Sequence, residues 1–344
     1  MNQKVGIGSL CFSKAPFIVS TASVVGKKEG EGPLGSCFDV VLTDEKLGEE
    51  SWEAAESALQ KEALTVTLGK INKKAQDVRY LFAGDLLGQT IASSFGLKDF
   101  HIPMFGLYGA CSTCGESLSL ASMAVAAGYA DCVAAVTSSH FASAEKQFRF
   151  PLEYANQRPK SATWTVTGSG AFLLCSKEQM EEWRLKPIAR ITAITTGKIV
   201  DFGIRDSMNM GAAMAPAASD LISQHMRDFS RTEADYDRIV TGDLGTIGGE
   251  ILVDMLKDRG YDIASIYEDC GIKIYNGRTQ GTGAGGSGCG CSAVTLSGHY
   301  LEEIRRGKIK RMLFVPTGAL LSTVSFNEGQ SVPGIAHGVV IEGV

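Results

Sequence analysis

The stretch from Gly106 to Ser139, GLYGACSTCGESLSLASMAVAAGYADCVAAVTSS, decides how we interpret the fold. Small and apolar residues fill Ser117–Ala127 without a polar face, which predicts a helix buried on all sides. Gly128 ends that helix, and the short apolar run Cys132–Val136 predicts a buried strand. Cys111 lies just before the helix, where unpaired amides and the helix dipole favour a thiolate. A nucleophile would be made in this way, but composition alone favours a small cysteine packed against a neighbouring helix.

Composition limits the classes of protein that the chain can belong to. It has 344 residues, is 44% hydrophobic and carries a formal net charge of −5, so it can form one large domain or two fused halves. There is no long basic run, and nucleic acid is therefore not an expected partner. We expect no signal peptide in the first twelve residues and no transmembrane span. Nine cysteines in such a chain indicate reduced thiols in a cytosolic compartment.

Strand and helix patterns alternate along the chain, which predicts a layered α/β fold. The expected strands are 17–25, 78–83, 132–136, 164–175, 188–199, 237–241 and 311–315, and the expected helices are 52–72, 89–95 and 210–229. We expect residues 29–38 to form a polar loop and the charged residues 177–186 to form a solvated connection between two halves. These halves are 1–176 and 177–344.

A repeat within the sequence supports the two halves. The segment 80–86 (YLFAGDL) aligns with 238–244 (RIVTGDL), at an offset of 243 − 85 = 158. Aligning Gly307 with Gly128, at an offset of 307 − 128 = 179, also brings Gly290 onto Cys111. Duplication with internal pseudo-symmetry is therefore expected, with one buried helix from each half at the centre.

Three motifs resemble those of a known superfamily. They are 109–118 (GACSTCGESL), 165–171 (TVTGSGA) and 281–288 (GTGAGGSG). They are similar, in the same order, to the nucleophile turn, the strand entry that ends the first half, and the late glycine-rich motif of the thiolase and β-ketoacyl synthase superfamily. The resemblance implies a five-layer αβαβα fold with two pseudo-symmetric halves, and a homodimer that pairs along a sheet edge.

Two further stretches carry a more specific resemblance. Residues 138–151 (SSHFASAEKQFRFP) and 156–168 (NQRPKSATWTVTG) resemble the stage V sporulation protein AD family. This resemblance implies a non-catalytic protein that binds dipicolinic acid, free or as the calcium chelate, for its uptake into the developing spore and its release. It also implies membrane-protein partners from the same sporulation operon, and a peripheral location on the cytoplasmic side of a spore membrane.

Two positions depart from the enzymes of the superfamily. Thr282 stands where the late motif has its histidine, and a threonine cannot accept a proton at neutral pH. Asp243 stands at the other basic position, where a carboxylate would raise the pKa of Cys111 by like-charge repulsion. We therefore expect no catalytic residue, with Cys111 left at a vestigial nucleophile position.

Dipicolinate carries two carboxylates on a pyridine ring, so its site should offer cationic or amide donors and an apolar slot. The resemblance places this site over Cys111, with His140, Phe148, Arg149, Arg205 and Thr282 as further candidates. If calcium accompanies the ligand, Asp243 is an oxygen ligand of suitable type. Each arginine also has an ordinary explanation as a surface or ion-pair residue, and His140 as a structural histidine.

Other functions stay open at this point. Cys111 could act in an acyl-transferring or condensing enzyme with His140 as its base, or the protein could be a scaffold that docks onto membrane transport subunits. A redox role for Cys111 and Cys114 lacks a thioredoxin-like context. A zinc site of Cys111, Cys114, Cys289 and Cys291 is disfavoured by their spacing and by the glycines around them. We expect no cofactor and no metal.

Overall fold

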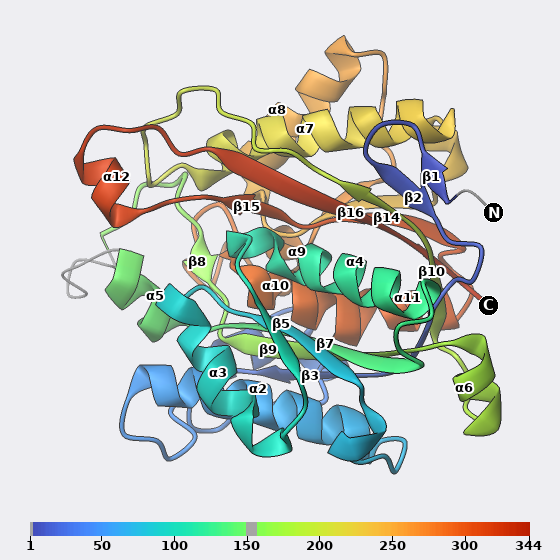
Figure 1. The fold of residues 1–344 in the computed structure, drawn as a ribbon. Helices are drawn as coiled ribbons and strands as arrows, with labels where there is room; N and C mark the ends of the chain where they lie inside the picture. Colours follow the sequence, from blue (N-terminus) through green and yellow to red (C-terminus); the bar gives the residue numbers. More distant parts are fainter. Residues whose placement is uncertain (1–2, 149–156) are drawn as a thin grey trace.

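Five layers of helix and sheet make up the fold in a computed structural model, which describes residues 3–148 and 157–344 (Figure 1). The first sheet has the strand order β6 (Met104–Leu107), β5 (Tyr80–Gly84), β7 (Cys132–Ser139), β9 (Gly168–Cys175) and β3 (Phe17–Val25). The second has the order β12 (Tyr267–Asp269), β11 (Arg238–Thr241), β14 (Arg311–Val315), β16 (Gly334–Glu342) and β10 (Ala189–Thr196). The ends of β3 and β10 pair with each other, so the two sheets are continuous.

Both sheets repeat one pairing pattern. In the first, β5 runs parallel to β6 and β7, and β9 runs antiparallel to β7 and β3. In the second, β11 runs parallel to β12 and β14, and β16 runs antiparallel to β14 and β10. The repeat seen in the sequence therefore has a structural counterpart, because 80–84 lies in β5 and 238–241 lies in β11.

Helices form the other three layers (Figure 1). One outer layer has α2 (Trp52–Gly69) and α3 (Ile91–Leu97), and the other has α7 (Met210–Phe229) and α8 (Gly245–Asp258). The central layer has α4 (Thr113–Ala126), α10 (Cys289–Thr295), a π-helical segment (Leu296–Tyr300) and α11 (Leu301–Arg305). The five-layer α/β fold predicted from the sequence is confirmed.

Shorter elements connect these layers. The short strands are β1 (Lys4–Val5), β2 (Ser9–Cys11), β4 (Val40–Val41), β8 (Trp164–Thr165), β13 (Gly286–Ser287) and β15 (Thr317–Ala319). The short helices are α1 (Lys27–Gly30), α5 (Phe141–Phe148), α6 (Lys177–Glu182), α9 (Cys270–Ile274) and α12 (Thr323–Asn327). Among the described residues, no helix combines the length and the apolar character that crossing a bilayer requires.

The central helix begins at Thr113, just after Cys111 as expected, because the side chain of Thr113 accepts a hydrogen bond from the amide of Gly109 and donates one to the carbonyl of Ala110. One expectation needs correction. The segment 29–38 is not simply a polar loop: its first two residues are the end of α1, and Glu29 is 1% exposed. Its carboxylate accepts hydrogen bonds from the amide of Thr167 and the hydroxyl of Tyr275, so a charged residue is buried because it holds two distant segments together.

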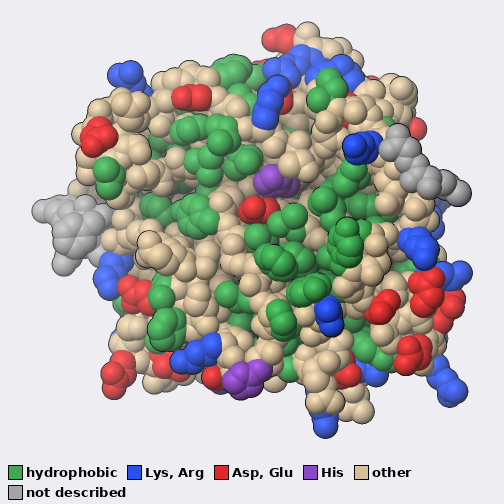
Figure 2. Space-filling view, in the orientation of Figure 1, with side chains coloured by type: hydrophobic (Ala, Val, Ile, Leu, Met, Phe, Trp, Pro, Cys, Tyr) green, Lys and Arg blue, Asp and Glu red, His purple; other side chains and the backbone are tan. Residues whose placement is uncertain are grey.

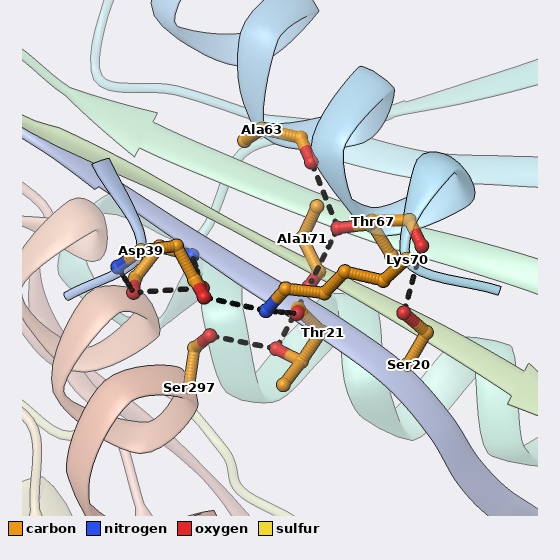
Figure 3. A network of polar contacts seen from close by, with 9 residues as sticks. Ser20, Thr21, Asp39, Ala63, Thr67, Lys70, Ala171 and Ser297 are labelled. Atoms are coloured by element: carbon orange, nitrogen blue, oxygen red, sulfur yellow. Dashed lines mark hydrogen bonds and ion pairs between the residues drawn. The ribbon is translucent and has the colours of Figure 1, made fainter. Parts of the chain in front are cut away.

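A polar network attaches the π-helical segment between α10 and α11 to the first sheet (Figure 3). The hydroxyl of Thr21 on β3 is 2.7 Å from that of Ser297 in the π-helical segment. Lys70, at the end of α2, donates to the carbonyl of Thr21 at 2.6 Å and forms an ion pair with Asp39 at 2.6 Å. Elements from both halves are thus joined through a single residue of β3.

Candidate functional site

Cys111 lies in the tight turn that leads into α4, and its side chain is 5% exposed. Ala110 before it has a positive φ of 50°. On the other side, β15 passes so close that a Cβ at Gly318 would lie 2.2 Å from the carbonyl oxygen of Gly109 and 3.1 Å from the amide nitrogen of Cys111. Only glycine allows this approach, so the nucleophile position of the first half is held by backbone from the second half.

A small cavity lies over Cys111, with a volume of about 30 Å³. Its walls are mostly apolar and include Tyr108, Phe148, Met210 and Leu321. A cavity of this size holds a water molecule or two, whereas ligand pockets for small molecules usually exceed 300 Å³. In this conformation the space over Cys111 is therefore too small for an aromatic ring with two carboxylates.

Asp243 is the charged residue with the largest effect on the pKa of Cys111. It is fully buried, and its carboxylate accepts hydrogen bonds from the amide of Gly288 at 2.8 Å and the hydroxyl of Ser287 at 3.2 Å. Burial, opposed by these hydrogen bonds and one from the thiol of Cys111, raises the pKa of Asp243 to about 7. Burial and then the carboxylate of Asp243 raise the pKa of Cys111 well above its usual range. The thiol is thus kept protonated, which opposes nucleophilic chemistry.

His140 does not lie at the cavity. It is 1% exposed, and its Nδ1 accepts a hydrogen bond from the amide of Ala142 at 3.1 Å. Its Nε2 therefore carries the proton and donates to the carbonyl of Glu45 at 2.9 Å. The ring packs against Trp52 with a centroid distance of 5.4 Å, and burial lowers the pKa of His140. Both nitrogens are used by the backbone, so the imidazole is neutral and structural rather than a base for Cys111.

The other candidates are placed unevenly. Phe148, at the end of α5, lines the cavity over Cys111. Arg205 is exposed in the connection before α7, and Thr282 is buried in the turn before β13; neither is among the residues that line the cavity. Arg149 lies outside the described residues. Cys111 and Phe148 thus line the cavity, and Asp243 acts on Cys111 without being a lining residue. His140, Arg205 and Thr282 are not among the lining residues.

Glu145 is a wall residue that the sequence did not reveal. It is 1% exposed, and its carboxylate accepts a hydrogen bond from Thr165 at 3.0 Å and forms an ion pair with Arg158 at 2.9 Å. The guanidinium of Arg158 lies 5.0 Å from the ring centre of Trp164. A pair separated by thirteen residues in sequence leaves no periodic signal, and only the stretch 138–151, which carries a family resemblance, pointed to this region.

Comparisons with known proteins agree with this geometry. The model of the family described as "Stage V sporulation protein AD (SpoVAD)" matches residues 6–342. The chain belongs to the SpoVAD family. It is 44% identical over 331 residues to the stage V sporulation protein AD of Bacillus subtilis (strain 168), covering 96% of this chain and 95% of that protein. It is therefore a sporulation protein with a thiolase-like fold.

Solved structures of a thiolase share this fold. Human mitochondrial 3-ketoacyl-CoA thiolase in complex with CoA superimposes with a TM-score of 0.61 at 14% identity, covering 96% of this chain and 98% of the thiolase. The same human enzyme in a second structure gives a TM-score of 0.60 at 12% identity, covering 96% of this chain and 99% of the thiolase. At this identity the likeness concerns the fold alone.

The remaining cysteines of this SpoVAD-family chain are not bonded to Cys111. All nine cysteines are free thiols. Cys114 is completely buried one turn into α4, and burial raises its pKa to about 12. In the described parts of the chain, no group of three or more Cys, His, Asp or Glu side chains is arranged to hold a metal ion.

Proposed function

We propose that this protein binds dipicolinate in the pocket over Cys111 and does not transfer acyl groups. The observation that carries the second part is the contact between Asp243 and Cys111, since a carboxylate raises the pKa of the thiol where an acyl-transferring enzyme needs a base to lower it. Dipicolinate itself is suggested by the family resemblance, because its members are sporulation proteins.

The apolar walls of the cavity suit a flat aromatic ring better than a charged group. Tyr108, Phe148, Met210 and Leu321 can contact the ring, and a carboxylate beside Cys111 would lie near the N-terminus of α4, which begins two residues later. The second carboxylate needs a cation. Arg149 follows Phe148 directly in the sequence, and Arg205 lies in the exposed connection before Met210, a lining residue, so this connection must fold over the cavity for Arg205 to reach the ligand. Because the cavity holds only about 30 Å³, binding must move wall side chains apart, and Phe148 at the end of α5 is best placed to move.

Titration calorimetry with dipicolinate, with and without calcium, tests this proposal directly. We expect Cys111→Trp to abolish binding by filling the cavity, and Arg205→Ala to weaken it about ten- to a hundredfold. Arg227→Ala, an exposed arginine on α7, is the matched control. Unchanged affinity in both Cys111→Trp and Arg205→Ala would place the ligand elsewhere. A stable adduct on Cys111 after incubation with acyl-CoA, detected by mass spectrometry, would restore the enzyme interpretation.

A scaffold function is the second candidate, and the small cavity is the observation that favours it. In that case the pocket is vestigial and the protein docks onto membrane proteins of its operon from the cytoplasmic side. This function predicts neither dipicolinate binding nor acylation, together with retention of the protein on spore membranes that contain those partners.

We also propose a homodimer formed along β6. This strand is the free edge of the first sheet, and it exposes Met104 (37%) and Phe105 (53%), with Tyr108 (44%) just beyond it. Figure 2 shows apolar side chains gathered over the middle of the face on which β6 lies. An exposed apolar edge strand is a template for pairing with a second chain.

A further inference from the structure

Cys132 and Cys175 lie directly opposite each other on neighbouring antiparallel strands. Cys132 opens β7, Cys175 ends β9, and the two residues are partners in the register of this pair. The amide of Ser176 donates to the carbonyl of Asp131 at 2.8 Å, just beyond the pair, so the cysteines themselves occupy a non-hydrogen-bonded position. At such positions the Cα atoms are about 4.5 Å apart, which is within the range that a disulfide spans.

Both side chains point to the same face of the sheet. Cys132 and Cys175 belong to the cluster packed beneath α2, whereas their neighbours Val133 and Leu174 belong to the central cluster on the other face. The two thiols are also close enough to interact: the neighbouring Cys175 is the largest cause of a raised pKa at Cys132, followed by burial. Position, direction and proximity therefore all meet the requirements of a cross-strand disulfide.

We propose that Cys132 and Cys175 form a reversible cross-strand disulfide when the protein is exposed to a peroxide. One thiolate attacks the peroxide and becomes a sulfenic acid, with release of water. The second thiol then displaces the hydroxyl as a second water, so that two thiols and one hydrogen peroxide give one disulfide and two waters. The sulfurs lose two electrons in total, and the peroxide gains them.

Solvent comes close to this pair although both side chains are buried, at 3% and 0% exposure. A surface cavity of about 910 Å³ is lined by Asp131 and Ser176, the residues next to the two cysteines. Opening the last residues of the two strands is enough to admit a peroxide, since strand ends open more readily than strand centres. Because Cys175 and burial raise the pKa of the Cys132 thiol, this residue forms little thiolate at neutral pH, and oxidation should take hours with excess peroxide rather than seconds.

The disulfide would close a loop that includes α5 and β8, which border the cavity over Cys111. Cross-linking residues this far apart reduces the freedom of the unfolded chain and stabilises the fold. The oxidised protein should therefore unfold at a temperature several degrees higher than the reduced protein.

The experiment uses the full chain with the exposed Cys11 and Cys37 changed to serine, which leaves 9 − 2 = 7 thiols. After treatment with hydrogen peroxide, we expect thiol titration under denaturing conditions to fall by two. Peptide mapping should give a linked 132–175 pair two hydrogens lighter than its parts, and dithiothreitol should reverse the rise in unfolding temperature. Cys175→Ala should lose these effects, and Cys270→Ala, another buried cysteine, should keep them.

Peptide mapping of the oxidised parent decides the matter even if a variant folds poorly. A different cysteine pair, irreversible sulfinic acid at Cys132, or no loss of thiols after prolonged treatment would each overturn the proposal.

Discussion

The carboxylate of Asp243 and the thiol of Cys111 are both buried, in the space between the two halves, and the carboxylate raises the pKa of the thiol. Both groups resist ionisation there, because burial disfavours either charge and the carboxylate of Asp243 further disfavours a thiolate at Cys111. The dipole of a helix usually lowers the pKa of a thiol at its start. The carboxylate of Asp243 opposes this effect at Cys111. The pair is the physical basis on which we expect a protonated, slowly reacting thiol at this turn of the thiolase-like fold.

We predict that Cys111 reacts slowly with iodoacetamide at neutral pH and that Asp243→Asn speeds this reaction about tenfold, the effect of lowering a thiol pKa by about one unit. Burial, the largest cause of the raised pKa, remains in the variant, so activation should be partial. Peptide mass spectrometry over time measures the rate, and the exposed Cys11 and Cys37 provide fast internal references. Equal rates for parent and Asp243→Asn would show that the carboxylate does not control the thiol.

Glu29 should make stability depend on pH. Burial raises its pKa to about 7, so the folded protein binds this proton more tightly than the unfolded chain. Its contribution to stability is complete below about pH 4.5 and is lost as pH rises through about 7, an effect of about 3 kcal/mol. We predict that the unfolding temperature of Glu29→Gln falls less steeply between pH 5 and 8 than that of the parent. Glu31→Gln, at an exposed position two residues away, should follow the parent.

The edge strand β6 offers a test of the dimer. Phe105→Lys places a charge on an exposed apolar edge, so we predict a dimer in the parent and a monomer in the variant at micromolar concentration. Light scattering measures the mass. Ile7→Lys is the control, because Ile7 is 91% exposed in the hairpin of β1 and β2. A parent that is monomeric at this concentration would refute the proposed dimer.

The fold could be predicted where a local pattern and its repeat agreed. The ranges 17–25, 210–229 and 311–315 match β3, α7 and β14 because each is a continuous apolar or amphipathic run with clear ends. No pattern in the sequence predicted β12 or β15. Each is three residues long and is fixed by pairing with a distant strand. The π-helical segment is likewise set by contacts across the fold, such as that of Ser297 with Thr21, and not by its own sequence.

The candidate site, like the fold, could be predicted from the sequence only in part. The superfamily resemblance was enough to suggest that Asp243 lies near Cys111, because Asp243 stands at the second basic position of that pattern. His140 could not be assigned, because its role depends on the carbonyl of Glu45, which is 95 residues away. The size of the cavity depends on side-chain packing from several elements, and no sequence pattern reports it.

Gly290 tests how closely the two central helices must approach the sheet. A Cβ at this position would lie 2.5 Å from the carbonyl oxygen of Gly168 and 2.7 Å from the amide nitrogen of Ser139, and neither backbone atom can move freely. We predict that Gly290→Ala lowers the free energy of unfolding by about 2 kcal/mol or more, because overpacking displaces backbone at the ends of β7 and β9. Gly69→Ala, at the end of α2, is the matched control: a Cβ there meets nothing within 4 Å, so this change should be neutral or slightly stabilising. Chemical denaturation of both variants measures the difference, and a Gly290→Ala protein as stable as the parent would show that the central layer can move away from the sheet at little cost.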